Sequence, residues 1–364
     1  QSESEFQHIR KVHTTALASR LVEPDPVRVV EVQRCFHLQA RLRPQQRYLA
    51  TVMELASGDL ATLITSKQVM TLQEISILGR DLFRALSWVH KANLVHGDVK
   101  PYNIVWKFDA EGKMQYLLAD FGSACKHGDV SDPDYMVTRP YRPPEVVLRL
   151  SRVDKPIDIW SAGCVIAEAA LGRPMFQADN VVELVAQWVD AIGPPPGSVV
   201  EDSDIAERFF RWSEPAFQYL MPPLSDSWKI VRSRNQRHNY YYHRRVESEE
   251  GPTAQYERPI PQMEDMVNIQ AQLSRVAPGW SCRLSKNVAP GQIVYMNDNL
   301  GTAQWHSPSM RDLRYTMSLR YPGILTSLQG NRLIDAVNSL LCWSPNARPT
   351  AEKAKAMQPF CAPI

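Results

Sequence analysis

Residues 157–171 (IDIWSAGCVIAEAAL) constrain the fold more than any other segment. The segment is apolar on nearly every face of a helix, and such a helix has to be buried on all sides. It is shorter than the roughly 20 residues that a membrane-spanning helix needs, and it carries Asp158 and Glu168. We therefore predict a central core helix that ends at Gly172, surrounded by other elements of a globular domain.

The elements expected around this helix follow a simple order. Two β-rich stretches, residues 27–35 and 47–53, come first and are predicted to form an antiparallel pair. A capping box at Thr71 and Glu74 then opens a helix with apolar residues at helical spacing, expected to run to about His90. Further helices are predicted at residues 60–64, 181–192, 325–341 and 350–357, whereas residues 198–310 look irregular. Strands followed by helices predict an α+β fold with a small and a large lobe.

Composition and charge exclude several classes of protein. The 364 residues carry a net charge of only +2, so no global basic field indicates nucleic-acid binding. Six cysteines are scattered without a CxxC pair, which argues against a disulfide scaffold or a zinc site. We therefore expect a reduced, intracellular protein, cytoplasmic or nuclear, with no membrane contact.

The strongest chemical signal is HGDVKPYN at residues 96–103, followed by ADFG at residues 119–122. Asp98 stands five residues before Asn103, and Asp120 ends an apolar, strand-like run. A carboxylate and an amide in one loop, facing a second carboxylate, can hold Mg²⁺ through hard oxygen ligands and leave one carboxylate to orient a hydroxyl. Phosphoryl transfer needs this equipment, because it depends on positioning and charge neutralisation.

These motifs resemble the signature of the eukaryotic protein kinases, whose catalytic loop, DFG and APE sequences have compatible spacing. The resemblance implies a bilobal protein-kinase-like fold, ATP and Mg²⁺ as cofactors, and a protein substrate. It makes Asp98 the catalytic base that accepts the proton of the substrate hydroxyl. Lys100 would neutralise the γ-phosphate, Asn103 and Asp120 would hold the metal, and the hydroxyl of Thr138 would bind both Asp98 and Lys100.

Aminoglycoside and choline phosphotransferases are a rival family, because their loops also read HGD followed by asparagine. Three later motifs favour the CMGC group of protein kinases instead: TRPYRPPE at 138–145, DIWSAGC at 158–164 and ARPT at 347–350. The resemblance implies a buried ion pair between Glu145 and Arg348. It also implies that His96 stacks on Phe121 and that Asp158 accepts backbone N–H groups of the catalytic loop.

Three residues near the catalytic loop refine this reading. Lys100, two residues after Asp98, is the serine/threonine pattern of the family. Tyr135 lies where MAP and dual-specificity-related kinases carry a regulatory tyrosine, although it could equally be an ordinary loop residue. Gly97 replaces an arginine that gathers an activation-segment phosphate in the family, so we expect activity not to depend on phosphate held by residue 97. Arg139 or Arg142 could take that part.

The nucleotide site follows from the same resemblance. Met53 corresponds to the gatekeeper, and backbone groups of Glu54 and Ala56 would pair with adenine. Asp59 lies where CMGC members bind ribose, and Val105 would lie beneath the purine.

The family pattern stops near the start of the chain. Residues 5–12 resemble the end of helix C, with Glu5 as the glutamate that pairs with a strand lysine, and residues 13–26 would be an insertion. No glycine precedes Gly58, and Lys11 is the only lysine in that stretch. Two alternatives remain: a truncated kinase, in which we expect weak ATP binding and little catalysis, or a pseudokinase that acts as a scaffold or regulator. Upstream coding sequence with a G-x-G-x-x-G and a V-A-x-K pattern would favour the first.

The expected division of the chain is therefore residues 1–56 as a partial small lobe with helix C, strands 4 and 5 and the hinge, and residues 57–364 as the large lobe. The large lobe would carry an enlarged insert at about 198–310. Within it, residues 229–245 are basic and rich in tyrosine. A solvated insert explains them better than RNA binding, because three glutamates follow directly. Docking of a partner protein on the insert is a hypothesis.

Overall fold

A computed structural model describes most of the chain before residue 214 and again after residue 323, with short segments between. The described residues are 2–19, 25–40, 43–67, 70–130, 137–178, 181–213, 218–220, 228–232, 239–243, 254–255, 281–284, 293–297, 302–304, 317, 321 and 324–361. They form two compact units, of which the first comprises residues 1–146, 152–175 and 317–364 and the second comprises residues 147–151 and 176–316. Tyr135, the candidate regulatory tyrosine, lies outside the described residues.

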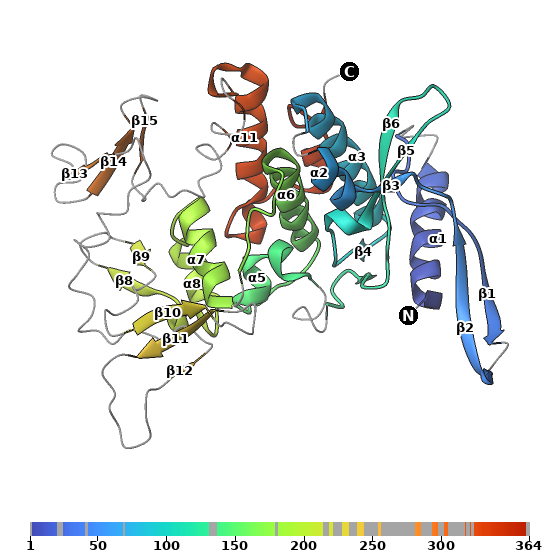
Figure 1. Cartoon of the computed structure of the whole chain (residues 1–364), viewed down its shortest axis with the longest axis horizontal. Helices are drawn as coiled ribbons and strands as arrows, with labels where there is room; N and C mark the ends of the chain where they lie inside the picture. The colour runs from blue at the N-terminus through green and yellow to red at the C-terminus, as the bar shows by residue number, and fades with distance from the viewer. Residues whose placement is uncertain are drawn as a thin grey trace. The chain divides into compact units, whose positions relative to one another are not determined.

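The first unit begins with helix α1 (Ser2–Ser19), which lies beside a long hairpin of β1 (Val32–Ala40) and β2 (Arg43–Met53) (Figure 1). The prediction that the helix ends near Val12 is wrong, since α1 runs on to Ser19. Ile9, Val12 and Ala16 are all buried and recur at helical spacing, so nothing in the sequence interrupts the buried face.

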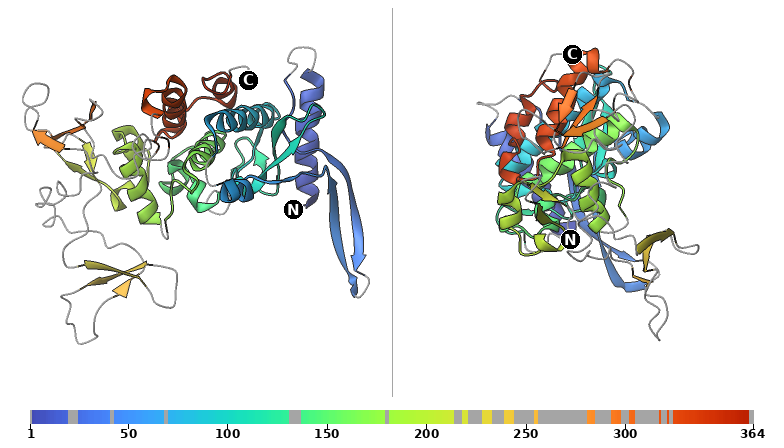
Figure 2. Two further views of the ribbon diagram at one scale, coloured as in Figure 1. Left: turned by 45° about the horizontal axis from the view of Figure 1, so that its top comes forward. Right: turned by 90° about the vertical axis from the view of Figure 1, so that its left-hand side faces the viewer.

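The hairpin confirms the predicted antiparallel pair, with its register set by partners such as Cys35 and Thr51. Figure 2 shows it as a narrow two-stranded ribbon that projects past α1. The first predicted strand starts too early, however. Before Val32 the chain instead runs along β6, where Val30 N–H donates to Leu118 O and Leu118 N–H donates to Arg28 O. Val29 and Val30 are buried there, so burial against another strand decided their pairing.

A second small sheet and a two-stranded ladder frame the loops that carry the motifs. The sheet has the order β3 (Gly58–Asp59), β5 (Ile104–Phe108) and β6 (Met114–Leu118), and all its pairs are antiparallel. The ladder pairs β4 (Leu94–Val95) with β7 (Cys125–Lys126). The HGDVKPYN motif lies between β4 and β5, and the ADFG motif lies between β6 and β7.

Helices form the remainder of the first unit. Their bounds are α2 (Leu60–Lys67), α3 (Leu72–Lys91), the short helix η1 (Pro101–Asn103), η2 (Arg139–Tyr141), α5 (Pro144–Val147), α6 (Pro156–Leu171), η6 (Ile324–Thr326), α11 (Leu328–Leu340), η7 (Pro345–Ala347) and α12 (Ala351–Lys355). The predicted capping box at Thr71 is present. The single helix predicted for residues 325–341 is divided at Ser327, which caps α11 by accepting a hydrogen bond from the Gly330 N–H.

Helix α6 is the predicted central helix. Every residue from Ile157 to Leu171 is buried, and Gly172 ends the helix in a left-handed conformation. Helix α11 packs directly against it. A Cβ atom on Gly163 would lie 2.9 Å from Leu340 Cβ, so glycine at this position permits the close approach of the two helices (Figure 1). No described helix is long and apolar enough to cross a membrane.

Glu168 of α6 is buried, and no cation pairs with it in the part of the chain that the structure describes. The Tyr141 hydroxyl donates a hydrogen bond of 2.7 Å to Glu168 Oε2, and this bond favours the ionised form. Burial has the larger effect and raises the pKa of Glu168 to about 7. Between its unfolded pKa near 4.5 and this value, the folded state holds a proton that the unfolded state has lost. Stability therefore falls as pH rises through that window.

We predict that Glu168→Gln removes this dependence. Raising the pH from about 5 to about 8 should lower the unfolding free energy of the wild type by up to ~3 kcal/mol more than that of the variant. Urea unfolding at the two pH values measures the difference. Tyr141→Phe, which removes the donor, should steepen the wild-type dependence. An identical pH profile for the wild type and Glu168→Gln would contradict the assignment.

The described residues of the second unit form helices and several small antiparallel sheets. The helices are α7 (Val181–Ile192), α8 (Gly197–Glu201) and η3 (Ala206–Arg208). One sheet pairs β8 (Arg211–Ser213) with β9 (Gln218–Leu220). A second has the order β10 (Trp228–Arg232), β11 (Asn239–His243) and β12 (Ala254–Gln255). A third has the order β13 (Ser281–Leu284), β14 (Ile293–Asn297) and β15 (Thr302–Gln304). The expectation that residues 198–310 are irregular is therefore wrong for these strands. WKIVR and NYYYH are rich in aromatic and β-branched residues, which pack well in strands.

Candidate active site

The loop after β4 is built around the buried imidazole of His96. Its Nε2 lies 3.1 Å from Ala119 O, which can only accept, so Nε2 carries the proton. Its Nδ1 accepts from the Asp98 N–H at 3.3 Å. Burial lowers the pKa of His96, which keeps the ring neutral and both bonds intact. The ring meets Phe121 edge to face at 4.8 Å between centroids, which confirms the predicted contact with the ADFG motif.

The carboxylate of Asp158, on α6, holds the start of the same loop through hydrogen bonds to its backbone. Its two oxygens accept the backbone N–H groups of His96 and Gly97, each at 2.9 Å, as predicted. Burial alone would raise the pKa of Asp158, but the hydrogen bond and charge of His90 together with the loop N–H groups hold it below its usual value. Gly97 adopts φ +79°, a left-handed conformation that favours glycine.

The structure brings four predicted residues together at Asp98. Lys100 Nζ contacts Asp98 Oδ2, and it also lies 3.2 Å from Thr138 Oγ1. The Thr138 hydroxyl donates to Asp98 Oδ1 at 2.7 Å, although it lies forty positions further along the chain. Asn103 Nδ2 donates to the carbonyl oxygen of Asp98 at 2.9 Å and to Oδ2 at 3.2 Å. The carboxylate is therefore held in one orientation by three side chains, which is the arrangement that a positioned base requires.

Asn103 and Asp120 meet the chemical requirements of a Mg²⁺ site. Because Nδ2 of Asn103 is bonded to Asp98, its side-chain oxygen is the atom left for a metal. Asp120 is exposed, with φ +60°, and Gly122 N–H donates to its Oδ1 at 3.2 Å. Among the described residues no three His, Cys, Asp or Glu side chains form a metal cluster. An amide and a carboxylate suit Mg²⁺, which retains waters and takes further oxygens from substrate phosphates.

Glu5 of α1 lies beside the same motif. Burial and the charge of Asp120 raise the pKa of Glu5, and a hydrogen bond from the Phe121 N–H lowers it in part. No lysine pairs with Glu5 in the described part of the chain. The predicted helix-C glutamate thus lies beside the ADFG motif, whereas Lys11 lies further along α1.

The residues predicted for nucleotide binding lie on β2, β3, β5 and the connection between β2 and β3. Both the backbone and the side chain of Glu54 have partners. Its N–H donates to Glu31 O, and its carboxylate contacts Lys107. Asp59 caps α2 by accepting from Thr62 N–H at 2.8 Å and from the Thr62 hydroxyl at 2.9 Å. Met53 is 41% exposed, while Ala56 and Val105 are half-buried.

The predicted ion pair between Glu145 and Arg348 is confirmed. Two parallel hydrogen bonds of 2.6 and 2.7 Å join the side chains, and both side chains are fully buried. Arg348 also donates to the carbonyl oxygens of Cys342 and Pro156 and lies 5.0 Å from the Trp160 ring. The pair ties the end of the TRPYRPPE motif to α6 and to the ARPT motif.

Sequence reasoning missed His90, whose Nε2 lies 2.9 Å from Asp158 Oδ2. It also missed the pairing of Tyr141 with Glu168. Both contacts join residues at least 27 positions apart, so periodicity could not reveal them. Polar residues on buried helix faces were the available signal, because buried polar groups need partners.

A family-model comparison matches residues 21–218 to the protein kinase domain. That match covers more than half of the chain, and the chain belongs to the protein kinase domain family. The predicted α+β kinase fold and the predicted family are thereby confirmed.

Similar proteins indicate which group of protein kinases the chain resembles. Mitogen-activated protein kinase HOG1 of Exserohilum turcicum is 33% identical over 181 residues, which is 49% of this chain and 52% of that protein. The HOG1 kinase of Alternaria brassicicola is 34% identical over 181 residues, covering 49% of this chain and 48% of its own. Mitogen-activated protein kinase 15 of Arabidopsis thaliana is 33% identical over 216 residues, which is 56% of this chain and 36% of that protein. The chain thus spans about half the length of the HOG1 relatives, and these MAP kinases confirm its likeness to the CMGC group.

Proposed function

We propose that this protein is a serine/threonine protein kinase that transfers the γ-phosphate of MgATP to hydroxyl groups of a protein substrate. The observation that carries the proposal is the constraint on Asp98, whose carboxylate is held by Lys100, Thr138 and Asn103. A hydrogen-bonded carboxylate in this position can orient a substrate hydroxyl and accept its proton. The CMGC motifs favour a protein substrate over an aminoglycoside or choline.

Each residue then has a defined part. Asp98 receives the proton, and Lys100 bears the positive charge beside the transferred phosphate. Thr138 fixes both side chains through its hydroxyl. Asn103 and Asp120 hold Mg²⁺, which when bound neutralises the charge that develops on the phosphate oxygens.

The nucleotide would lie against the segment from β2 to β3. Backbone groups of Glu54 and Ala56 would pair with adenine, Met53 and Val105 would contact the purine, and Asp59 would reach the ribose. Glu5 would help to orient the phosphates from α1. Asp59 already accepts two hydrogen bonds from Thr62, so contact with ribose requires it to share or exchange them.

A second candidate, a non-catalytic kinase homologue that acts as a scaffold or regulator, is favoured by one observation. In the described residues Glu5 has no lysine partner, and a kinase uses such a pair to hold the nucleotide phosphates.

Transfer of radiolabelled γ-phosphate to a basic protein, followed by phosphoamino-acid analysis, distinguishes the candidates. We expect slow, Mg²⁺-dependent labelling of serine and threonine that Asp120→Asn abolishes. Labelling that persists in Asp120→Asn would identify a contaminating kinase. Absence of both labelling and ATP binding would favour the scaffold.

A further inference from the structure

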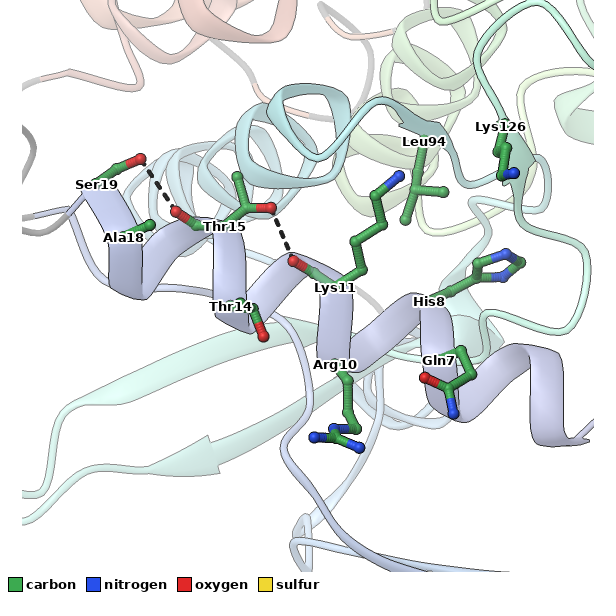
Figure 3. A pocket seen from close by; sticks show the side chains of 10 residues that line it. All are labelled: Gln7, His8, Arg10, Lys11, Thr14, Thr15, Ala18, Ser19, Leu94 and Lys126. Carbon is green, nitrogen blue, oxygen red and sulfur yellow. Dashed lines mark hydrogen bonds between the residues drawn. The ribbon is translucent and has the colours of Figure 1, made fainter.

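An open groove of about 810 Å³ runs along one face of α1 (Figure 3). We call it the α1 groove. Its α1 side is lined by Ala18 and by polar residues from Gln7 to Ser19, and its other side by Leu94 of β4 and Lys126 of β7. The lining face is distinct from the buried face of α1, which carries Ile9, Val12 and Ala16. The groove is separate from the candidate active site, because none of the predicted catalytic residues lines it.

The groove is positively charged. Its lining includes the charged side chains of Arg10, Lys11 and Lys126, and no aspartate or glutamate. Neither Lys11 nor Lys126 forms an ion pair with any of the described residues. In Figure 3 the side chains of Lys11 and His8 extend from α1 toward the side on which Leu94 and Lys126 lie.

Lys11 and Lys126 both lie near the ring of His8. Burial is the main cause that lowers the pKa of His8; a hydrogen bond to the backbone of Phe121 raises it in part, and the charges of Lys11 and Lys126 lower it. Glu5, one turn earlier on α1, interacts with Phe121 instead of these cations. A set of like charges without a counterion favours occupation by an anion.

The length of the groove indicates what kind of anion fits. Gln7 and Ser19 are twelve positions apart, which is about 18 Å at the helical rise. An extended peptide of five or six residues spans about that distance at its rise per residue. Exposed hydroxyl and amide groups of Thr14 and Gln7 along the groove can bond to a peptide backbone, whereas a single phosphate would occupy only one end.

We propose that the α1 groove binds an extended acidic segment of a partner protein, five or six residues long, with carboxylates that pair with Lys11 and Lys126. The proposal does not rest on phosphoryl transfer. It applies equally to an active kinase and to a scaffold.

Fluorescence anisotropy with the full chain tests the proposal. The probe is a fluorescein-labelled hexapeptide, Gly-Asp-Glu-Asp-Glu-Gly, and its amide counterpart, Gly-Asn-Gln-Asn-Gln-Gly, is the matched control. We expect the acidic probe to bind and the amide probe not to bind. Lys11→Glu and Lys126→Glu should each weaken binding about tenfold, since each replaces an attraction with a repulsion. Lys11→Arg, which keeps the charge, should bind like the wild type.

Two further variants distinguish the groove from other basic surfaces. Lys113→Glu makes the same change on an exposed turn, and Lys229→Glu makes it in β10 within the basic segment. Both should bind the acidic probe normally, and thermal melting should confirm that all variants are folded. Unchanged binding by folded Lys11→Glu and Lys126→Glu, or loss of binding in Lys229→Glu, would overturn the proposal. So would tight binding of inorganic phosphate without binding of the peptide, which would indicate a site for one small anion.

Discussion

Arg348→Met should lower the free energy of unfolding by about 3–5 kcal/mol, because it leaves the Glu145 carboxylate buried without a cation. The guanidinium also bonds to the carbonyl oxygens of Cys342 and Pro156, and those bonds are lost with it. Chemical denaturation monitored by tryptophan fluorescence measures the change. Arg348→Lys keeps the charge but loses the bidentate geometry, so we expect an intermediate loss.

A double-mutant cycle isolates the ion pair from the other contacts of Arg348. Glu145→Met combined with Arg348→Met removes both charges, and the double variant should be less destabilised than the sum of the two single variants. The difference is the coupling energy of the pair. Losses that simply add would show that the two side chains do not depend on each other, contrary to the two short hydrogen bonds between them.

Asp98→Asn should reduce the rate of phosphoryl transfer by about 10²–10⁴-fold, because an amide cannot accept the proton of the substrate hydroxyl. The substitution preserves shape and retains an oxygen that can accept from Thr138. ATP binding should therefore change little. Single-turnover kinetics together with a nucleotide-binding assay separate the two effects.

Asp109→Asn supplies the matched control, since Asp109 accepts backbone N–H groups in the turn between β5 and β6. Its rate should equal that of the wild type. Thr138→Val and Thr138→Ser add a second comparison, in which only the valine variant loses the hydroxyl that positions Asp98. Equal rates for the wild type and Asp98→Asn would reject the assigned base.

Much of the site was predictable because its residues are close in sequence. Asp98, Lys100 and Asn103 fall within one loop, so their spacing alone placed them together. The partners of Asp158 were predicted only through the resemblance to kinases, and His90 was not predicted at all. A polar residue on a largely buried helix signals the need for a partner, but nothing local indicates that the partner lies on α6.

The secondary structure likewise separates features that local sequence predicts from features that depend on distant contacts. The apolar run of α6 and the capping box of α3 are local patterns, and the structure contains both. The end of α1, the start of β1 and the strands after residue 210 were wrong or missed. At residues 28–30 the choice between two strand partners depended on burial against β6, which local propensity does not encode.

The sequence by itself determined the protein kinase family, the α+β fold and the identity of the residues proposed for catalysis, since short motifs and hydrophobic periodicity encode these. The tertiary structure decided contacts between distant segments that no motif predicted: His90 with Asp158, Tyr141 with Glu168, and α1 with the β4–β7 ladder. The basic groove beside α1 is the clearest case. Lys11 and Lys126 are far apart along the chain, and only packing of the helix beside the ladder brings together these two charges, which have no ion-pair partner among the described residues.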